Sequence, residues 1–151
     1  MDWPWLSTVW LGNNSFSGQI PSSIGNLRYL TSLHLYRNSL SGELPLSMQN
    51  CSGLTTLDLK MNSFTGKLPA WIGKYLPDMK YLSIRSNRFD GEIPKEICHL
   101  TSLQILDIAL NNFSGRLKIP ACVCCTPGRL NIDSEQVLAY PRVIRRTAAK
   151  P

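Results

Sequence analysis

The sequence contains no uninterrupted apolar run approaching the roughly 18 residues that a membrane-spanning helix requires. Its opening residues, MDWPWLSTVW, also lack the basic segment and the long apolar core of a secretory signal peptide. We therefore predict no direct membrane insertion by this chain, and no targeting signal within it specifies its localisation.

Signatures of common enzyme chemistry are missing as well. The sequence has no phosphate-cradling glycine loop, no kinase catalytic-loop motif, no GxSxG and no HExxH. Histidine, the most frequent general base, occurs only at His34 and His99. We therefore predict that the protein is not an enzyme, with no catalytic residue and no cofactor.

Clustered positive charge is absent from most of the chain. Residues 1–115 hold nine Lys and Arg against eight Asp and Glu, whereas residues 116–151 hold seven against two, so the net charge of +6 belongs mainly to the tail. A surface shaped for nucleic acid needs a basic stripe on ordered structure. We therefore predict no nucleic-acid partner and interpret the tail as a solvated basic segment.

What the sequence does contain is an internal repeat. The segment NSLSGELP at 38–45 recurs with small changes at 14–21, 62–69 and 87–94, and in a weaker copy at 111–118. Successive repeat glycines are separated by 24, 24, 25 and 24 residues. Those glycines are Gly18, Gly42, Gly66, Gly91 and Gly115. A recurrence at this period indicates a repeat architecture.

Upstream of each copy, apolar residues lie three, three and two positions apart, as in Leu27, Leu30, Leu33 and Leu35. The closing pair has the spacing of a short strand with one buried face. Strands at one fixed interval, with too little chain between them for a long helix, predict the stacked coils of a solenoid. Side chains equivalent to Leu33 should then form one file through the interior.

Each residue that recurs in the turn segments has a physical role. The repeated Asn can replace the backbone hydrogen bonds that are lost where the chain leaves the strand. The Phe or Leu two positions later should point into the core. The Gly permits a turn or a close approach, and the Pro holds the chain extended on the far side of the coil.

The pattern LxxLxxLxLxxNxLSGxIPxxL resembles the plant extracellular type of leucine-rich repeat, from about Trp3 to Leu117. The segments ELPLSMQNCSGLTTLDL and EICHLTSLQILDIALNNFSG are most similar to late repeats of receptor-like proteins and receptor-like kinases. The resemblance implies an α/β-type solenoid, a right-handed coil with one parallel β-sheet on its concave face and short 3-10, helical or extended segments on its convex face. It also implies a fragment, with about five repeats over residues 1–117, the first partial and without an N-terminal cap. Residues 118–151 should form a Cys-containing, basic, irregular or disordered tail.

The same resemblance implies a non-catalytic module that binds a peptide or protein ligand in cell-surface signalling or defence, with a co-receptor kinase as a further partner. The family acts at the extracellular face of the plasma membrane. Variable side chains around each strand on the concave face become the ligand-binding candidates, and the alternative for each is that it is plain surface. These candidates are Trp10, His34, Tyr36, Arg37, Asp58, Lys60, Tyr81, Arg85 and Asp107. Asp58 and Asp107 share a column two coils apart, roughly 10 Å on the strand spacing, and form a hydrophilic column more readily than an acid–base pair.

Two alternatives stay open at this point. The chain could be a soluble inhibitor of a secreted cell-wall hydrolase, as the related polygalacturonase-inhibiting proteins are. It could also be a truncated product with no independent function, because terminal coils without polar caps are a solubility liability.

The cysteines and sequons complete the candidates. Cys51 occupies a core leucine position, whereas Cys98 and Cys122 each lie seven residues after a repeat glycine and could stack within disulfide reach. The cluster at 122–125 has no partner CxxC, so no metal site is predicted. Glycosylation candidates are Asn13, Asn50 and Asn112, provided that the chain is exported.

Overall fold

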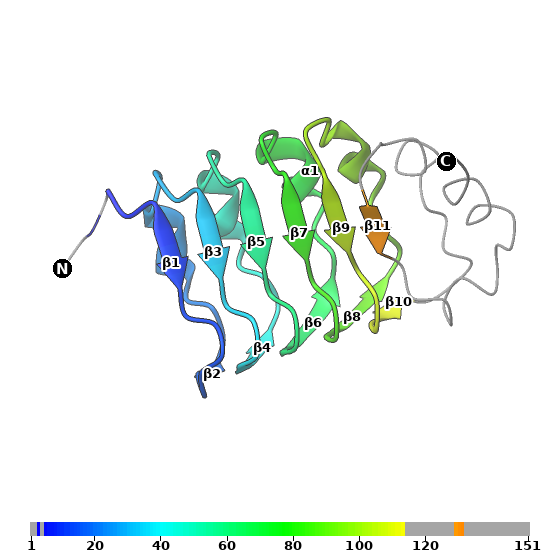
Figure 1. The fold of residues 1–151 in the computed structure, drawn as a ribbon, viewed down its shortest axis with the longest axis horizontal. Coiled ribbons are helices and arrows are strands. Elements are labelled where there is room, and N and C mark those ends of the chain that lie inside the picture. Colours follow the sequence, from blue (N-terminus) through cyan, green and yellow to red (C-terminus); the bar gives the residue numbers. More distant parts are fainter. Residues whose placement is uncertain (1–2, 4, 114–128, 132–151) are drawn as a thin grey trace, which may run out of the picture.

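The computed structural model describes residue 3, residues 5–113 and residues 129–131, and it shows a solenoid of stacked coils (Figure 1). Each coil adds one short strand to a parallel six-stranded sheet of order β1-β3-β5-β7-β9-β11, which is the predicted concave sheet. Its strands are β1 (Thr8–Trp10), β3 (Ser32–His34), β5 (Thr56–Asp58), β7 (Tyr81–Ser83), β9 (Ile105–Asp107) and β11 (Arg129–Asn131). The predicted leucine-rich repeat solenoid is confirmed.

The centre of each concave strand lies in register with its neighbours. Val9 pairs with Leu33, Leu33 with Leu57, and the file continues to Leu82 and Leu106. The four leucines are at most 3% exposed. The predicted single file of interior side chains is therefore present, and each coil encloses the apolar surface of its neighbour.

A second parallel sheet, of order β10-β8-β6-β4-β2, runs beside the first and was not predicted. Its strands are β2 (Ser17–Gly18), β4 (Ser39–Gly42), β6 (Ser63–Lys67), β8 (Arg88–Gly91) and β10 (Asn112–Phe113). The repeated NSLSG letters, rich in Ser and Gly, indicated only a turn. Stacking at a constant period brings these segments side by side, so their backbone groups pair although their sequences have weak strand propensity.

Short helices close each coil on the side away from the concave sheet. They are the 3-10 helices η1 (Ser22–Asn26), η2 (Leu46–Asn50) and η3 (Lys95–His99) and the α-helix α1 (Trp71–Tyr75). The α-helix lies in the repeat with 25 residues. An α-turn advances about 1.5 Å per residue against about 2.0 Å in a 3-10 helix, so covering the same span takes more residues.

A ladder of asparagine side chains links the coils, as predicted. Asn62 Nδ2 donates to the carbonyl of Leu59 in its own coil and to that of Leu35 in the preceding coil, at 3.1 and 2.9 Å. Its Oδ1 accepts the N–H of Leu40 at 3.0 Å. Equivalent bonds are made by Asn38, Asn87 and Asn111.

The first coil differs from the interior coils in its exposure. Phe16 is 48% exposed, whereas Phe64 and Phe89 in the same motif position are fully buried. Leu11 is likewise 40% exposed, whereas its counterpart Leu59 is buried. Coils on both sides are thus needed to bury the repeat's apolar residues.

The cysteine predictions have separate outcomes. Cys51 is a free, fully buried thiol whose Sγ lies 3.5 Å from the carbonyl oxygen of Ile24, as expected for a small core residue. Cys98 is disulfide-bonded, and its partner lies outside the described residues. Cys122 also lies outside them, so its pairing with Cys98 stays a prediction.

Three residues of the 118–151 segment form a strand that the sequence did not indicate. Strand β11 pairs in parallel with β9, with Leu130 opposite Leu106. An irregular tail is therefore the wrong expectation for Arg129–Asn131, because the open edge of β9 offers backbone partners to a segment without leucine periodicity. The rest of the predicted tail, with residues 114–117, lies outside the described residues. None of the helices described is long and apolar enough to cross a membrane.

Candidate ligand-binding face

The concave sheet presents its candidate side chains in columns. Side chains alternate along a strand, so residues on either side of the buried leucine face away from the core. One column follows the printed strand register and contains Trp10, His34, Asp58, Ser83 and Asp107. The next column lies two residues further along each coil and contains Gly12, Tyr36, Lys60, Arg85 and Ala109. The repeat therefore gathers seven of the nine candidates into two adjacent columns over five coils.

An aromatic cluster occupies the first two coils. The rings of Trp10 and His34 stack with their centroids 4.1 Å apart, and Tyr36 meets Trp10 edge to face at 6.3 Å. Gly12 makes room for this arrangement, because a Cβ at that position would overlap the Tyr36 ring. Trp10 nevertheless remains 63% exposed, so the cluster offers a large aromatic surface to a partner.

Lys60 joins the aromatic cluster to the charged residues. Its Nζ lies 3.2 Å from Asp58 Oδ2 and 5.0 Å from the centre of the Tyr36 ring. Partial burial opposes the charge on Lys60, but the hydrogen bond and the charge of Asp58, with smaller contributions from Tyr81 and Tyr36, outweigh it and raise the pKa of Lys60. Lys60 therefore stays protonated and fixed over the ring.

A second ion pair repeats this arrangement towards the far end of the sheet. Arg85 Nη1 lies 3.6 Å from Asp107 Oδ1. In both pairs the carboxylate is recessed and the cation is outermost, with side-chain exposures of 6% for Asp58 and 34% for Lys60, and of 14% for Asp107 and 35% for Arg85. Ser83 lies between the two carboxylates in register, and its buried Oγ has no hydrogen-bond partner among the described residues.

The ionisation of His34 is set by its place in the cluster. Burial lowers the pKa of His34, and the charge of Lys60 lowers it further. The negative charge of Asp58, in the neighbouring strand of the same sheet, opposes this shift in the pKa. A neutral imidazole against the Trp10 ring is therefore the favoured form at neutral pH.

The remaining candidates lie close to these columns. Arg37 is exposed and follows Tyr36 directly, with a left-handed φ of 53°. The equivalent residues in the other coils share this conformation, which the sequence did not indicate; they are Asn13, Met61, Ser86 and Leu110. Tyr81 is half-buried at the start of β7, on the other side of Leu82 from Ser83. The sequon residues Asn13, Asn50 and Asn112 are all exposed.

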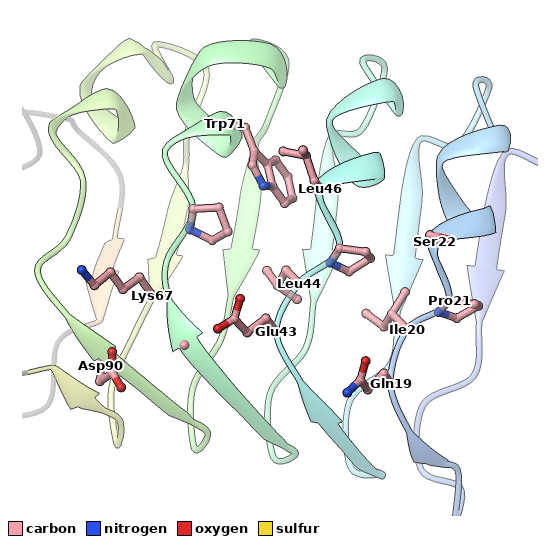
Figure 2. Close-up of a pocket in the computed structure, with 13 residues that line it drawn as sticks. Gln19, Ile20, Pro21, Ser22, Glu43, Leu44, Leu46, Lys67, Trp71 and Asp90 are labelled. Carbon is pink, nitrogen blue, oxygen red and sulfur yellow. The ribbon is translucent and has the colours of Figure 1, made fainter.

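The structure also has a groove that the sequence analysis did not anticipate, on the side of the coils opposite the concave sheet (Figure 2). It encloses about 1080 Å³. The exposed Leu46 and the largely buried Trp71 lie next to each other along one wall, and Glu43, Lys67 and Asp90 lie along the other. In this row Glu43 and Lys67 directly follow repeat glycines, whereas Asp90 directly precedes Gly91 and pairs with Lys67 in the strand register. The repeat period could have revealed that charged residues gather next to these glycines.

Comparison with known proteins agrees with the geometry. Leucine Rich Repeat family models match residues 5–27, 29–51, 53–75 and 78–100, and a further repeat model matches 99–116. The chain belongs to the leucine-rich repeat family. No curated protein sequence matches this leucine-rich repeat chain significantly.

Several solved structures are similar to this leucine-rich repeat chain. The ectodomain of the receptor kinase SOBIR1 from Arabidopsis thaliana is 30% identical with a TM-score of 0.76, covering 82% of this chain and 66% of that chain. The plant peptide hormone receptor RGFR1, in complex with RGF2, is 29% identical with a TM-score of 0.79, covering 86% of this chain and 21% of that chain. A plant ice-binding protein is 30% identical with a TM-score of 0.79, covering 86% of this chain and 42% of that chain. The chain thus spans less than two thirds of the length of each.

Proposed function

We propose that this chain is a recognition module that binds a peptide or protein ligand along its concave sheet, within a plant receptor-like protein of cell-surface signalling or defence. The observation that carries the proposal is the aromatic cluster on that sheet. An exposed tryptophan held by a stacked ring and an edge-on ring is pre-organised, so little side-chain entropy is lost on binding. Aromatic and arginine side chains are also the usual anchors of protein interfaces.

The similar receptor structures support this proposal. RGFR1 is a peptide hormone receptor solved with RGF2, and SOBIR1 is a receptor kinase. The ice-binding protein has an equally high TM-score, so the fold alone does not choose the ligand. The side chains of the concave sheet must therefore determine the ligand specificity. A co-receptor kinase as second partner belongs to the same proposal.

Selection from a random peptide display library tests the proposal. We expect selected peptides to bind the unaltered chain and to bind the double variant Trp10→Ala/Tyr36→Ala at least about tenfold more weakly, the equivalent of 1.4 kcal/mol. A matched control is Leu46→Ala/Tyr75→Ala, which removes two side chains exposed by 64% and 51% outside the concave sheet. Selected peptides that bind all three proteins equally well would contradict recognition by the concave sheet.

A further inference from the structure

The charged atoms that the concave sheet presents outward are mostly cationic. Asp58 and Asp107 are recessed beneath their partners, whereas Lys60 and Arg85 are each about one third exposed. Arg37 is exposed, and no ion pair involves it among the described residues. An approaching ligand therefore meets guanidinium and ammonium groups before it meets either carboxylate.

These three cations follow one another across adjacent coils. The N–H of Arg37 donates to the carbonyl of Lys60 at 2.9 Å, and the N–H of Met61, the residue after Lys60, donates to the carbonyl of Arg85 at 2.8 Å. Neighbouring strands lie about 4.8 Å apart, so the row spans roughly 10 Å along the solenoid. Acidic side chains at alternate positions of an extended peptide lie about 6.7 Å apart, so two of them fit within the length of this row.

The aromatic cluster lies at one end of the cationic row. Lys60 contacts the Tyr36 ring, and Tyr36 in turn contacts Trp10 in the first coil. The two ends of the concave face therefore differ along the solenoid axis. An exposed aromatic surface lies at the first coil, and cations lie over the second to fourth coils. With His34 neutral, three cations and two carboxylates leave one net positive charge in this area.

We propose that the ligand is an acidic peptide with an aromatic residue beside its acidic run, whose ring packs against Trp10 while its carboxylates meet Arg37, Lys60 and Arg85. This inference rests on the proposed function and adds the chemical class of the ligand. A basic peptide is disfavoured, because its cations would meet those of the sheet while the carboxylates below are already paired. Three cations are too few for a nucleic-acid surface, which depends on a longer basic stripe.

Binding of three short synthetic peptides, measured by fluorescence anisotropy, tests the charge preference. Each carries one tryptophan followed at alternate positions by aspartate, by asparagine or by lysine. We expect the aspartate peptide to bind at least about tenfold more tightly than the asparagine peptide, and its advantage to shrink at about 1 M salt, where charges are screened within about 3 Å. Equal affinity of the two, tighter binding of the lysine peptide, or no binding of the aspartate peptide would each overturn the inference. Complete displacement by an equimolar single-stranded oligonucleotide would overturn the choice of a peptide.

Variants locate the charge preference on the molecule. Arg37→Gln is the most direct, because no ion pair depends on this side chain, and it should weaken the aspartate peptide about threefold to tenfold while leaving the asparagine peptide unchanged. The double variant Asp58→Asn/Lys60→Gln removes one cation without leaving its buried carboxylate unpaired. Lys67→Gln, on the groove of the opposite side, is the matched control and should have no effect. Equal losses for Arg37→Gln and Lys67→Gln would contradict the placement.

The display experiment separates this inference from the proposed function. Library peptides that lose affinity for Trp10→Ala/Tyr36→Ala but are neutral or basic would overturn the acidic ligand and leave concave recognition intact. Library peptides that are acidic and keep their affinity for that variant would overturn both.

Discussion

The amide of Asn87 accepts the backbone N–H of Phe64, 23 residues earlier, at 3.0 Å. Its Nδ2 also donates to the carbonyl of Leu59 in the preceding coil. One buried side chain thus fixes two points of the neighbouring coil, and coils held in this way keep the columns of the concave sheet aligned. The proposed recognition surface depends on that alignment.

Replacing Asn87 tests the ladder directly. Asn87→Ala leaves the buried N–H of Phe64 without a partner, whereas the carbonyl of Leu59 keeps its hydrogen bond from Asn62. We therefore expect a loss of about 1 to 3 kcal/mol in the free energy of unfolding. Asn14→Ala is the matched control in the exposed first coil and should cost less than about 1 kcal/mol. Urea denaturation measures both values. Equal losses at the two positions would contradict a structural role that depends on burial.

A second pair of variants compares the phenylalanine of the repeat motif in the first coil with the equivalent phenylalanine in an interior coil. Phe64 is fully buried and stacks on Phe89 with ring centroids 6.4 Å apart, whereas Phe16 is 48% exposed. We expect Phe64→Ala to lower the free energy of unfolding by about 3 to 5 kcal/mol, because it removes a buried ring and leaves a cavity. Phe16→Ala should cost about 1 kcal/mol or less. Thermal melting of the two variants gives the comparison, and a larger loss at Phe16 would show that the first coil is covered in solution.

Two repeat glycines separate backbone strain from steric overlap. Gly18 and Gly66 have nearly the same left-handed φ, 83° and 82°. A Cβ at Gly18 would meet nothing within 4 Å, whereas at Gly66 it would lie 2.7 Å from Glu43 Cγ. We expect Gly18→Ala to cost about 1 to 2 kcal/mol from the left-handed backbone alone.

Gly66→Ala should cost more than Gly18→Ala, because the Glu43 side chain must also move. The double variant Glu43→Ala/Gly66→Ala, measured by the same denaturation, should recover the difference. No recovery would show that the strain lies in the backbone or in neighbours other than Glu43.

The ionisation of His34 can be followed by an NMR titration of its imidazole protons. We expect its pKa below the ordinary value near 6.5, because burial against Trp10 and the charge of Lys60 disfavour the imidazolium. A lowered pKa contributes stability that is present above the unfolded-state pKa and is lost as the pH falls through the folded-state pKa. Trp10→Ala should move the pKa upward by exposing the ring. A pKa above 6.5 in the unaltered chain would contradict the stacked arrangement.

The residues that follow the repeat rule could be placed from sequence. Leu33 and its equivalents form the interior file, the Asn ladder bridges the coils, and the four repeat glycines that the structure describes adopt positive φ. Each of these roles depends only on a position within one coil and on the presence of an identical neighbour. The spacing of letters therefore carried enough information to assign them.

Only part of the candidate site could be predicted from the sequence. The period of two within a strand placed Asp58 and Lys60 on the same face, yet it did not show that the carboxylate is recessed and the cation outermost. The stacking of Trp10 on His34 was also unpredictable, because it depends on rotamers and on the room left by Gly12.

By itself, the sequence determined the repeat period, the buried file and the family, because a constant spacing of leucine, asparagine and glycine satisfies the core and the backbone in only one stacked arrangement. Only the tertiary structure decided the second sheet, the added strand β11 and the outward cations of the concave face. These features arise between coils, where backbone edges meet and long side chains choose partners across strands. No local pattern within a single repeat encodes that choice.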